Sequence, residues 1–171
     1  MGLFTPTYYC RSLYDVPPEF YEKEGIQLLF CDLDNTLDAF DVDEPSDRAK
    51  ALVSDLNARG IRLIITSNNH GERVVRYAEA LGVTCCYSSR KPLGYRLKRF
   101  IRENRLNPDE IAMIGDQLLT DVLAGKNTRV RVILTEPLVN RDLPITRFNR
   151  FFDRRIRKII GKKLKQREVG K

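Results

Sequence analysis

Several residue types that build common catalytic and metal sites are scarce in this chain. Its 171 residues include one histidine, His70, and no tryptophan. A single histidine cannot form a multi-histidine zinc site, and it argues against a histidine-based catalytic triad. The chain also lacks the GxxxxGK[ST] and GxGxxG patterns whose glycine-rich loops bind nucleotide phosphates. Carboxylates, hydroxyls and amines remain as candidate reactive groups.

Cysteines and long hydrophobic runs are also limited. The four cysteines form no CxxC pair, and they are Cys10, Cys31, Cys85 and Cys86. Two of them fall in predicted buried strands, which indicates reduced structural thiols. No apolar run approaches the roughly 18–20 residues that span a bilayer, and the first residues lack the basic-then-apolar pattern of a signal peptide. We therefore expect a cytoplasmic protein.

A short apolar run at 28–31 ends in two aspartates, Asp32 and Asp34, followed by Thr36. Such a run is typical of a strand buried on both faces of a parallel sheet. Ligands bind beyond the carboxyl ends of such strands, so both aspartates are predicted at the mouth of a site. Two neighbouring carboxylates repel each other, and a hard cation can offset that repulsion. A solvated turn at the strand end is the alternative.

The rest of the chain alternates strand and helix patterns. Further strands are predicted at 61–66, 83–87, 111–116 and 129–134, and helices at about 46–59, 70–81, 93–104 and 120–126. This alternation predicts an α/β fold with a doubly wound parallel sheet. We divide the chain into an aromatic N-terminal arm (1–25), a sheet domain (26–140) and a basic amphipathic C-terminal segment (141–171).

Polar side chains follow each of the predicted strands that precede a helix. Ser67 and Asn68 follow the second strand, Lys91 the third, and Asp116 and Asp121 the fourth. Because the carboxyl ends of parallel strands share one edge of the sheet, these residues are predicted to meet Asp32 and Asp34 there.

These residues carry a resemblance to a known family. The segments Asp32-Leu33-Asp34-Asn35-Thr36, Ser67, Lys91-Pro92 and Gly115-Asp116-Gln117-Leu118-Leu119-Thr120-Asp121 resemble the four motifs of the haloacid dehalogenase (HAD) superfamily of phosphatases. Taken whole, the chain resembles the YqeG group of subfamily IIIA, which is itself similar to the mitochondrial phosphatidylglycerophosphate phosphatases. The resemblance implies a HAD-like Rossmann-type core and an Mg²⁺ cofactor.

The resemblance also implies a role for each motif aspartate. Asp32 would be the nucleophile and a metal ligand, forming an aspartyl-phosphate. Asp34 would bind the metal through its main-chain carbonyl and act as general acid and base through its side chain. Asp116 would be the second side-chain ligand, and Asp121 would support the metal.

The remaining polar residues would act on the phosphoryl group. Ser67 would donate a hydrogen bond to its oxygens, and Lys91 would neutralise developing charge. Asn68 fits either a substrate contact or a turn.

HAD enzymes usually carry a cap domain inserted after the first or second motif. Here 32 residues separate Thr36 from Asn69, and a loop, a helix and a strand account for them. We therefore expect a capless, open site, which suits a large or surface-held substrate.

The C-terminal segment is strongly basic, in a chain whose net charge is +7. Residues 141–171 hold twelve Lys or Arg against three Asp or Glu. Apolar residues recur there at three- and four-residue spacing: Phe148, Phe151, Phe152, Ile156, Ile159, Ile160 and Leu164. Such a helix can lie on an anionic bilayer, so residues 147–167 are a candidate peripheral membrane contact. A helix docked on the sheet domain and a nucleic-acid patch are the alternatives.

The sequence thus favours an Mg²⁺-dependent phosphomonoester hydrolase, with phosphatidylglycerophosphate as its substrate and phosphatidylglycerol as its product. The first alternative is a soluble phosphatase for a nucleotide, a sugar phosphate or a nucleic-acid end. The second is a nucleic-acid or ribosome-associated binding protein with a vestigial site. The complete aspartate set argues against the second, because a binding module has no use for Asp32 and Asp34 together.

Overall fold

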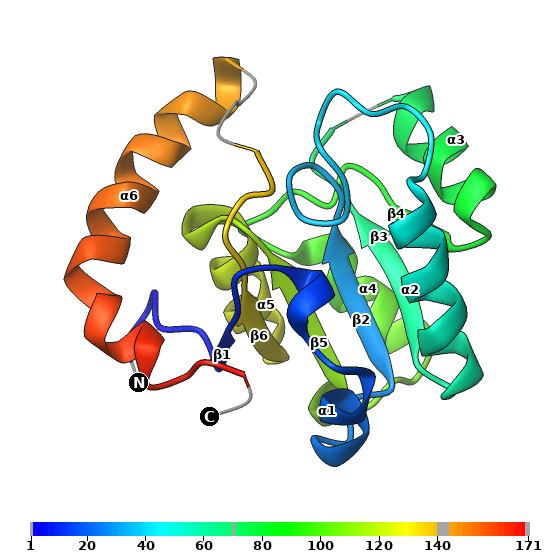
Figure 1. The fold of residues 1–171 in the computed structure, drawn as a ribbon, viewed down its shortest axis with the longest axis horizontal. Coiled ribbons are helices and arrows are strands. Elements are labelled where there is room, and N and C mark those ends of the chain that lie inside the picture. Colours follow the sequence, from blue (N-terminus) through cyan, green and yellow to red (C-terminus); the bar gives the residue numbers. More distant parts are fainter. Residues whose placement is uncertain (1, 70, 140–143, 170–171) are drawn as a thin grey trace.

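A parallel six-stranded sheet organises the computed structural model, which describes residues 2–69, 71–139 and 144–169, without the side chains of 144–150. His70 and the predicted boundary at residues 140 and 141 lie outside the described residues. The strand order is β1-β6-β5-β2-β3-β4 (Figure 1). The strands are β1 (Tyr8–Tyr9), β2 (Leu28–Asp32), β3 (Arg62–Thr66), β4 (Thr84–Cys86), β5 (Ile111–Gly115) and β6 (Arg131–Leu134).

Helices cover both faces of this sheet, as predicted for a doubly wound fold. They are α1 (Pro18–Lys23), α2 (Asp47–Ala58), α3 (Glu72–Leu81), α4 (Tyr95–Glu103), α5 (Leu123–Thr128) and α6 (Pro144–Lys165). Short helical turns add η1 (Leu13–Asp15), η2 (Pro108–Glu110) and η3 (Leu118–Val122). The α/β parallel architecture predicted from the sequence is confirmed.

Strand β2 shows how the sheet separates two cores. Its side chains alternate: Leu29 and Cys31 pack with α1, α2 and α3, whereas Leu28 and Phe30 pack with α4 and α5. All five β2 residues are buried, because both faces of the strand are covered. The chain leaves β2 toward β3 and β4, then returns to β5 on the other side. Ligands bind in the crevice that this change of direction leaves beyond the strand ends.

Capping residues define the start of α2 and the end of α3. The Ser46 side chain accepts a hydrogen bond from the Ala49 amide at 3.3 Å and caps α2. Gly82 ends α3 in the left-handed conformation, with φ at 71°. The helix predicted at 120–126 is different in the structure. A π-helical segment, η3, comes first and continues into α5, so the helical region begins at Leu118.

Strand β1 was not predicted. Tyr8 and Tyr9 pair in parallel with Ile133 and Leu134 of β6, which places part of the N-terminal segment inside the sheet. Two residues are too few to show the alternation that identifies a strand in a sequence.

Helix α6 lies alongside the sheet domain rather than apart from it (Figure 1). Ile156, Ile160 and Leu164 pack on a cluster that includes Val132 and Leu134 of β6. In contrast, Phe151, Phe152 and Ile159 are 52%, 40% and 82% exposed. The described apolar side chains of α6 therefore divide between an inner face on the sheet domain and an outer face toward solvent. Among the described helices, none combines the length and apolar character needed to cross a bilayer.

Candidate active site

The loop after β2 holds the first motif in a fixed, tight shape. Backbone amides of Leu37 and Asp38 donate to the Leu33 carbonyl at 3.1 and 3.2 Å, and Asn35 adopts φ of 67°. The buried Asp38 carboxylate anchors this loop, because it accepts hydrogen bonds from the Ser46 amide at 3.0 Å and the Tyr77 hydroxyl at 2.5 Å. Asp38 was not predicted as an anchor of the site, because its partners lie on α3 and at the start of α2.

Lys91 connects two of the predicted acidic residues. Its buried Nζ donates to Asp32 Oδ1 at 2.5 Å, to Asp121 Oδ1 at 2.7 Å and to the Thr66 carbonyl at 3.2 Å. Burial alone would lower the pKa of Lys91, but Asp121 and Asp32 more than compensate, so its pKa lies above the usual value. The lysine is therefore a permanent cation between the two carboxylates.

Asn68 holds the backbone that carries Lys91. Its side-chain oxygen accepts from the Lys91 amide at 2.8 Å, and its Nδ2 donates to the Lys91 carbonyl at 3.0 Å. Ser89 donates to the same Asn68 oxygen at 3.2 Å. In this structure Asn68 positions Lys91, and a direct substrate contact stays a prediction. Ser67 is buried beside it, and its Oγ accepts from the Asn69 amide at 3.0 Å. A hydroxyl that accepts one hydrogen bond can still donate its own proton, and the predicted contact of Ser67 with a phosphoryl oxygen stays a prediction.

Asp32, Asp116 and Asp121 form a buried acidic cluster at the carboxyl edge of the sheet. One oxygen from each carboxylate lies within 4.8 Å of the other two. Asp121 is held from both sides, because its Oδ2 accepts from the Gln117 amide at 3.0 Å while its Oδ1 accepts from Lys91. The structure thus brings together the three side chains that the sequence predicted as metal ligands or support.

The chemistry of this cluster fits a divalent cation. Burial raises the pKa of Asp32 well above its ordinary value; Lys91 opposes the rise, and Asp121 and Asp116 add to it. Lys91 contacts the carboxylates of Asp32 and Asp121, two of the three buried acids in this cluster. A cation bound among these acids would offset their mutual repulsion. Oxygen ligands in this number suit Mg²⁺, which usually completes its coordination with water and substrate phosphate. The side chains of Asp32, Asp116 and Asp121 and the main-chain carbonyl of Asp34 are the groups that would hold it.

Asp34 faces a different set of partners. Its carboxylate accepts from Arg73 at 2.8 Å and from Asn69 Nδ2 at 2.8 Å, and Arg73 also donates to the Phe40 carbonyl at 2.8 Å. Burial raises the pKa of Asp34 above its ordinary value, while Arg73, Lys91 and the Asn69 hydrogen bond oppose the rise. A carboxyl group with a raised pKa can hold a proton for a leaving oxygen. Arg73 was not predicted, since on the sequence it is one of two arginines on an amphipathic helix.

We expect Arg73→Met to lower kcat/KM by about tenfold or more, because Asp34 loses both an orienting hydrogen bond and a charge partner. Without Arg73 the pKa of Asp34 rises further. Activity that requires protonated Asp34 is lost as pH rises through this pKa, so the alkaline limb of the kcat/KM profile should move to higher pH. Steady-state rates at several pH values measure this. Arg76→Met, at an exposed position on the same helix, is the control. An alkaline limb at the same pH as in the wild type would show that Arg73 does not influence the pKa of Asp34.

Gly115 is close to Asp121 because it has no side chain. A Cβ atom at this position would lie 2.3 Å from Asp121 Cγ and 2.4 Å from its Oδ2. Any larger residue must therefore displace the Asp121 carboxylate from Lys91 and from the acidic cluster.

Gly115→Ala should reduce activity by about 100-fold and cost about 1–3 kcal/mol of stability, since the added methyl overpacks the site. Phosphate release and thermal unfolding measure the two effects. Gly161→Ala is the matched control, because a Cβ there meets nothing within 4 Å and should stabilise helix α6 by about 0.5–1 kcal/mol. Near-normal activity in Gly115→Ala would show that the position of Asp121 is not critical.

The family of the chain follows from comparison with known proteins. The family model of the haloacid dehalogenase-like hydrolases matches residues 6–128. The chain therefore belongs to the haloacid dehalogenase-like hydrolases, and the predicted HAD-type enzyme class is confirmed. It is 35% identical over 160 residues to the "Probable phosphatase YqeG" of Bacillus subtilis (strain 168), an alignment covering 94% of this chain and 93% of that protein.

Solved structures share the fold. A 3-deoxy-D-manno-octulosonate 8-phosphate phosphatase from Yersinia pestis has a TM-score of 0.53 at 15% identity, covering 70% of this chain and 77% of that one. The enzyme of that name from Moraxella catarrhalis, solved with a magnesium ion, a phosphate ion and KDO, has a TM-score of 0.52 at 21% identity, covering 82% of this chain and 98% of that one. At these identities the likeness concerns the fold alone.

Proposed function

We propose that the protein hydrolyses phosphomonoesters with Mg²⁺ through an aspartyl-phosphate on Asp32. The observation that carries the proposal is the contact of Lys91 with Asp32 and Asp121, within one buried cluster that also contains Asp116. A nucleic-acid-binding module has no need for buried carboxylates at this edge, and burying them costs stability.

The residues divide the reaction into two displacements. Asp32 Oδ attacks phosphorus, the bond from phosphorus to the alcohol oxygen breaks, and Asp34 gives its proton to that oxygen. Asp34 then takes a proton from water, the water oxygen attacks the same phosphorus, and the bond to Asp32 breaks to release inorganic phosphate. Lys91 and the Ser67 hydroxyl stabilise charge on the phosphoryl oxygens. Bound Mg²⁺ would neutralise negative charge on the Asp32 carboxylate and on the phosphate, which otherwise repel each other.

We further propose that the substrate is phosphatidylglycerophosphate and that the enzyme works on the cytoplasmic surface of an anionic membrane. The open edge of the site supports this, because the segments that follow β2 and β3 are a loop with α2 and a short turn with α3, with no cap domain among the described residues. The outer face of α6 also supports it. Phe151, Phe152 and Ile159 are exposed there, beside basic residues: Arg154, Arg155, Lys158, Lys162, Lys163 and Lys165. Apolar and basic side chains together suit an anionic bilayer.

Phosphate release from phosphatidylglycerophosphate in mixed micelles with Mg²⁺ tests this proposal. The wild type and Asp32→Asn are compared on that lipid, on p-nitrophenyl phosphate and on a sugar phosphate. Release from the lipid by the wild type alone supports both the reaction and the substrate. Cleavage of only the soluble esters would support the phosphatase activity and would indicate a soluble substrate instead of the lipid. No release from any substrate overturns the proposed function.

Membrane contact has its own test. Ile159→Asn should reduce co-sedimentation with phosphatidylglycerol vesicles several-fold, since it removes an apolar side chain that is 82% exposed. Leu93→Asn, at an exposed apolar residue ahead of α4, is the control. Equal vesicle binding by both variants and the wild type would show that α6 is not the membrane contact.

A further inference from the structure

The inner face of α6 reaches the segment that carries two of the candidate metal ligands. Asp153 is fully buried, and both its oxygens accept from the Leu118 amide, at 3.1 and 3.0 Å. One of them also accepts from the Leu119 amide at 3.4 Å. Leu118 and Leu119 begin η3, which follows Asp116 and contains Asp121.

The carboxylate of Asp153 supplies what the local sequence does not. The residue in the capping position of η3, Gln117, makes no side-chain capping hydrogen bond. The first amides of a helix need acceptors, because they have no partner within the helix. A buried carboxylate from a segment more than thirty residues away provides the acceptor here, and its negative charge suits the helix N-terminus.

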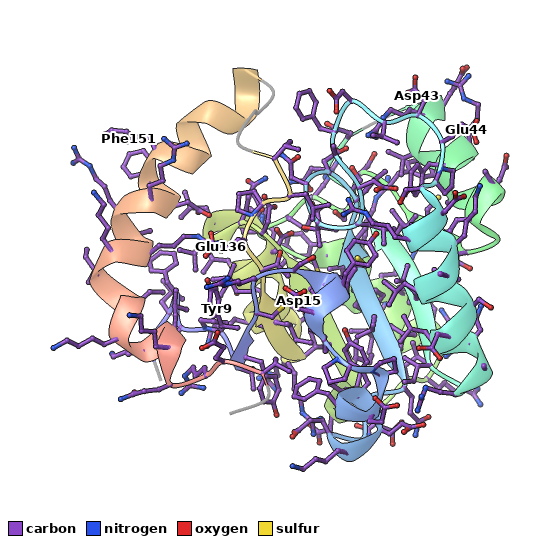
Figure 2. All side chains as sticks on the ribbon, viewed as in Figure 1. Tyr9, Asp15, Asp43, Glu44, Glu136 and Phe151 are labelled. Carbon is purple, nitrogen blue, oxygen red and sulfur yellow. The ribbon has the colours of Figure 1, made fainter. Side chains whose placement is uncertain are left out.

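Arg157, one turn further along α6, holds the other end of the same segment. One of its guanidinium nitrogens donates to the Asp116 carbonyl at 2.7 Å and to the Thr135 carbonyl at 2.8 Å. The other donates to Glu136 at 2.8 Å, and Tyr9 donates to the same Glu136 oxygen at 2.7 Å. Figure 2 shows Tyr9 and Glu136 between α6 and the sheet, with Phe151 on the opposite side of the helix. Arg157 thus connects the backbone of Asp116 to Thr135 and Glu136, which follow β6, and through Glu136 to Tyr9 of β1.

We infer that Asp153 and Arg157 are positioning residues of the metal site. Their hydrogen bonds hold the backbone at both sides of Gln117, and so set where the Asp116 and Asp121 carboxylates stand relative to Asp32. Neither residue touches the reacting atoms, so both act through the segment they hold. The inference rests on the proposed metal-dependent function.

Direct metal binding tests this inference. Mn²⁺ titration of the full chain, followed by electron paramagnetic resonance, gives the dissociation constant without any substrate. Asp153→Asn should raise it at least tenfold, because the amide replaces one acceptor by a donor. Arg157→Lys should raise it several-fold, because one ammonium cannot reproduce the planar set of bonds. Excess Mg²⁺ should restore most of the lost phosphatase rate in both variants.

Arg154→Gln is the matched control, because Arg154 is an exposed neighbour of Asp153 on the outer face of α6. All proteins are measured well below their unfolding temperatures in the absence of metal. A variant that unfolds earlier yet binds Mn²⁺ as tightly as the wild type would overturn the inference and leave α6 a purely stabilising helix. If Asp153→Asn does not fold, Arg157→Lys decides by the same criterion. Failure of the wild type to bind Mn²⁺ would instead refute the metal-dependent function.

Discussion

Asp32→Asn is expected to abolish phosphate release, with a loss of at least about 10³-fold in kcat, while the protein stays folded. An asparagine amide has nearly the same shape as the carboxylate but cannot form the aspartyl-phosphate. The substituted side chain can still accept a hydrogen bond from Lys91, which also keeps its contact with Asp121. Hydrolysis of p-nitrophenyl phosphate measures the loss of activity, and circular dichroism shows whether the variant stays folded.

Glu44→Gln is the control for this variant, because it removes an exposed carboxylate in the loop that follows the same strand (Figure 2). We expect near-normal activity from it. Activity within tenfold of the wild type in Asp32→Asn would assign the nucleophile to another residue and would remove the aspartyl-phosphate on Asp32 from the mechanism.

Lys91→Met should have the largest effect on stability together with a near-complete loss of activity. The substitution leaves Asp32 and Asp121 buried without their shared cation, and removing one partner of a buried ion pair costs about 3–5 kcal/mol. Urea unfolding at neutral pH, without metal, measures the loss. Lys98→Met, on the exposed face of α4, is the matched control and should change stability little.

The loss of stability in Lys91→Met should also depend on pH in a specific direction. Burial raises the pKa of Asp32, and loss of Lys91 removes the charge that opposes the rise. A carboxyl group whose pKa is raised in the folded state destabilises the protein as pH rises through that pKa. The deficit relative to the wild type should therefore shrink as pH falls toward the ordinary pKa of aspartate, and added Mg²⁺ should reduce it at neutral pH. A constant deficit across this range would show that Lys91 stabilises by packing alone.

The main acidic cluster could be predicted because each of its members follows a strand. In a parallel sheet the chain order alone brings Asp32, Asp116 and the residues near them to one edge, so spacing is sufficient information. Arg73, Asp153 and Arg157 could not be found in this way. Each lies on an amphipathic helix that carries other charged residues, and its partner is decided by how that helix packs on the sheet.

The C-terminal segment, too, could be predicted only in part from its sequence. Its amphipathic spacing predicted a helix, and α6 is one, but spacing does not identify which side of a helix a neighbour covers. The buried Asp153 and the partly buried Arg157 distinguish the inner face among its many charges, and both need the folded β5–η3 connection as a partner. A basic pattern alone would have assigned them to solvent.

Strand β1 would be the edge of the sheet, but residues after α6 cover it. The Tyr9 amide donates to the Arg167 carbonyl at 2.8 Å, and the Val169 amide donates to the Tyr9 carbonyl at 2.9 Å. A chain that ended at Gln166 would leave these backbone groups open, and an unpaired edge recruits strands from other molecules. The last described residues therefore protect the protein from edge-to-edge aggregation, and shortened versions of the chain are at risk of self-association even where their active site is intact.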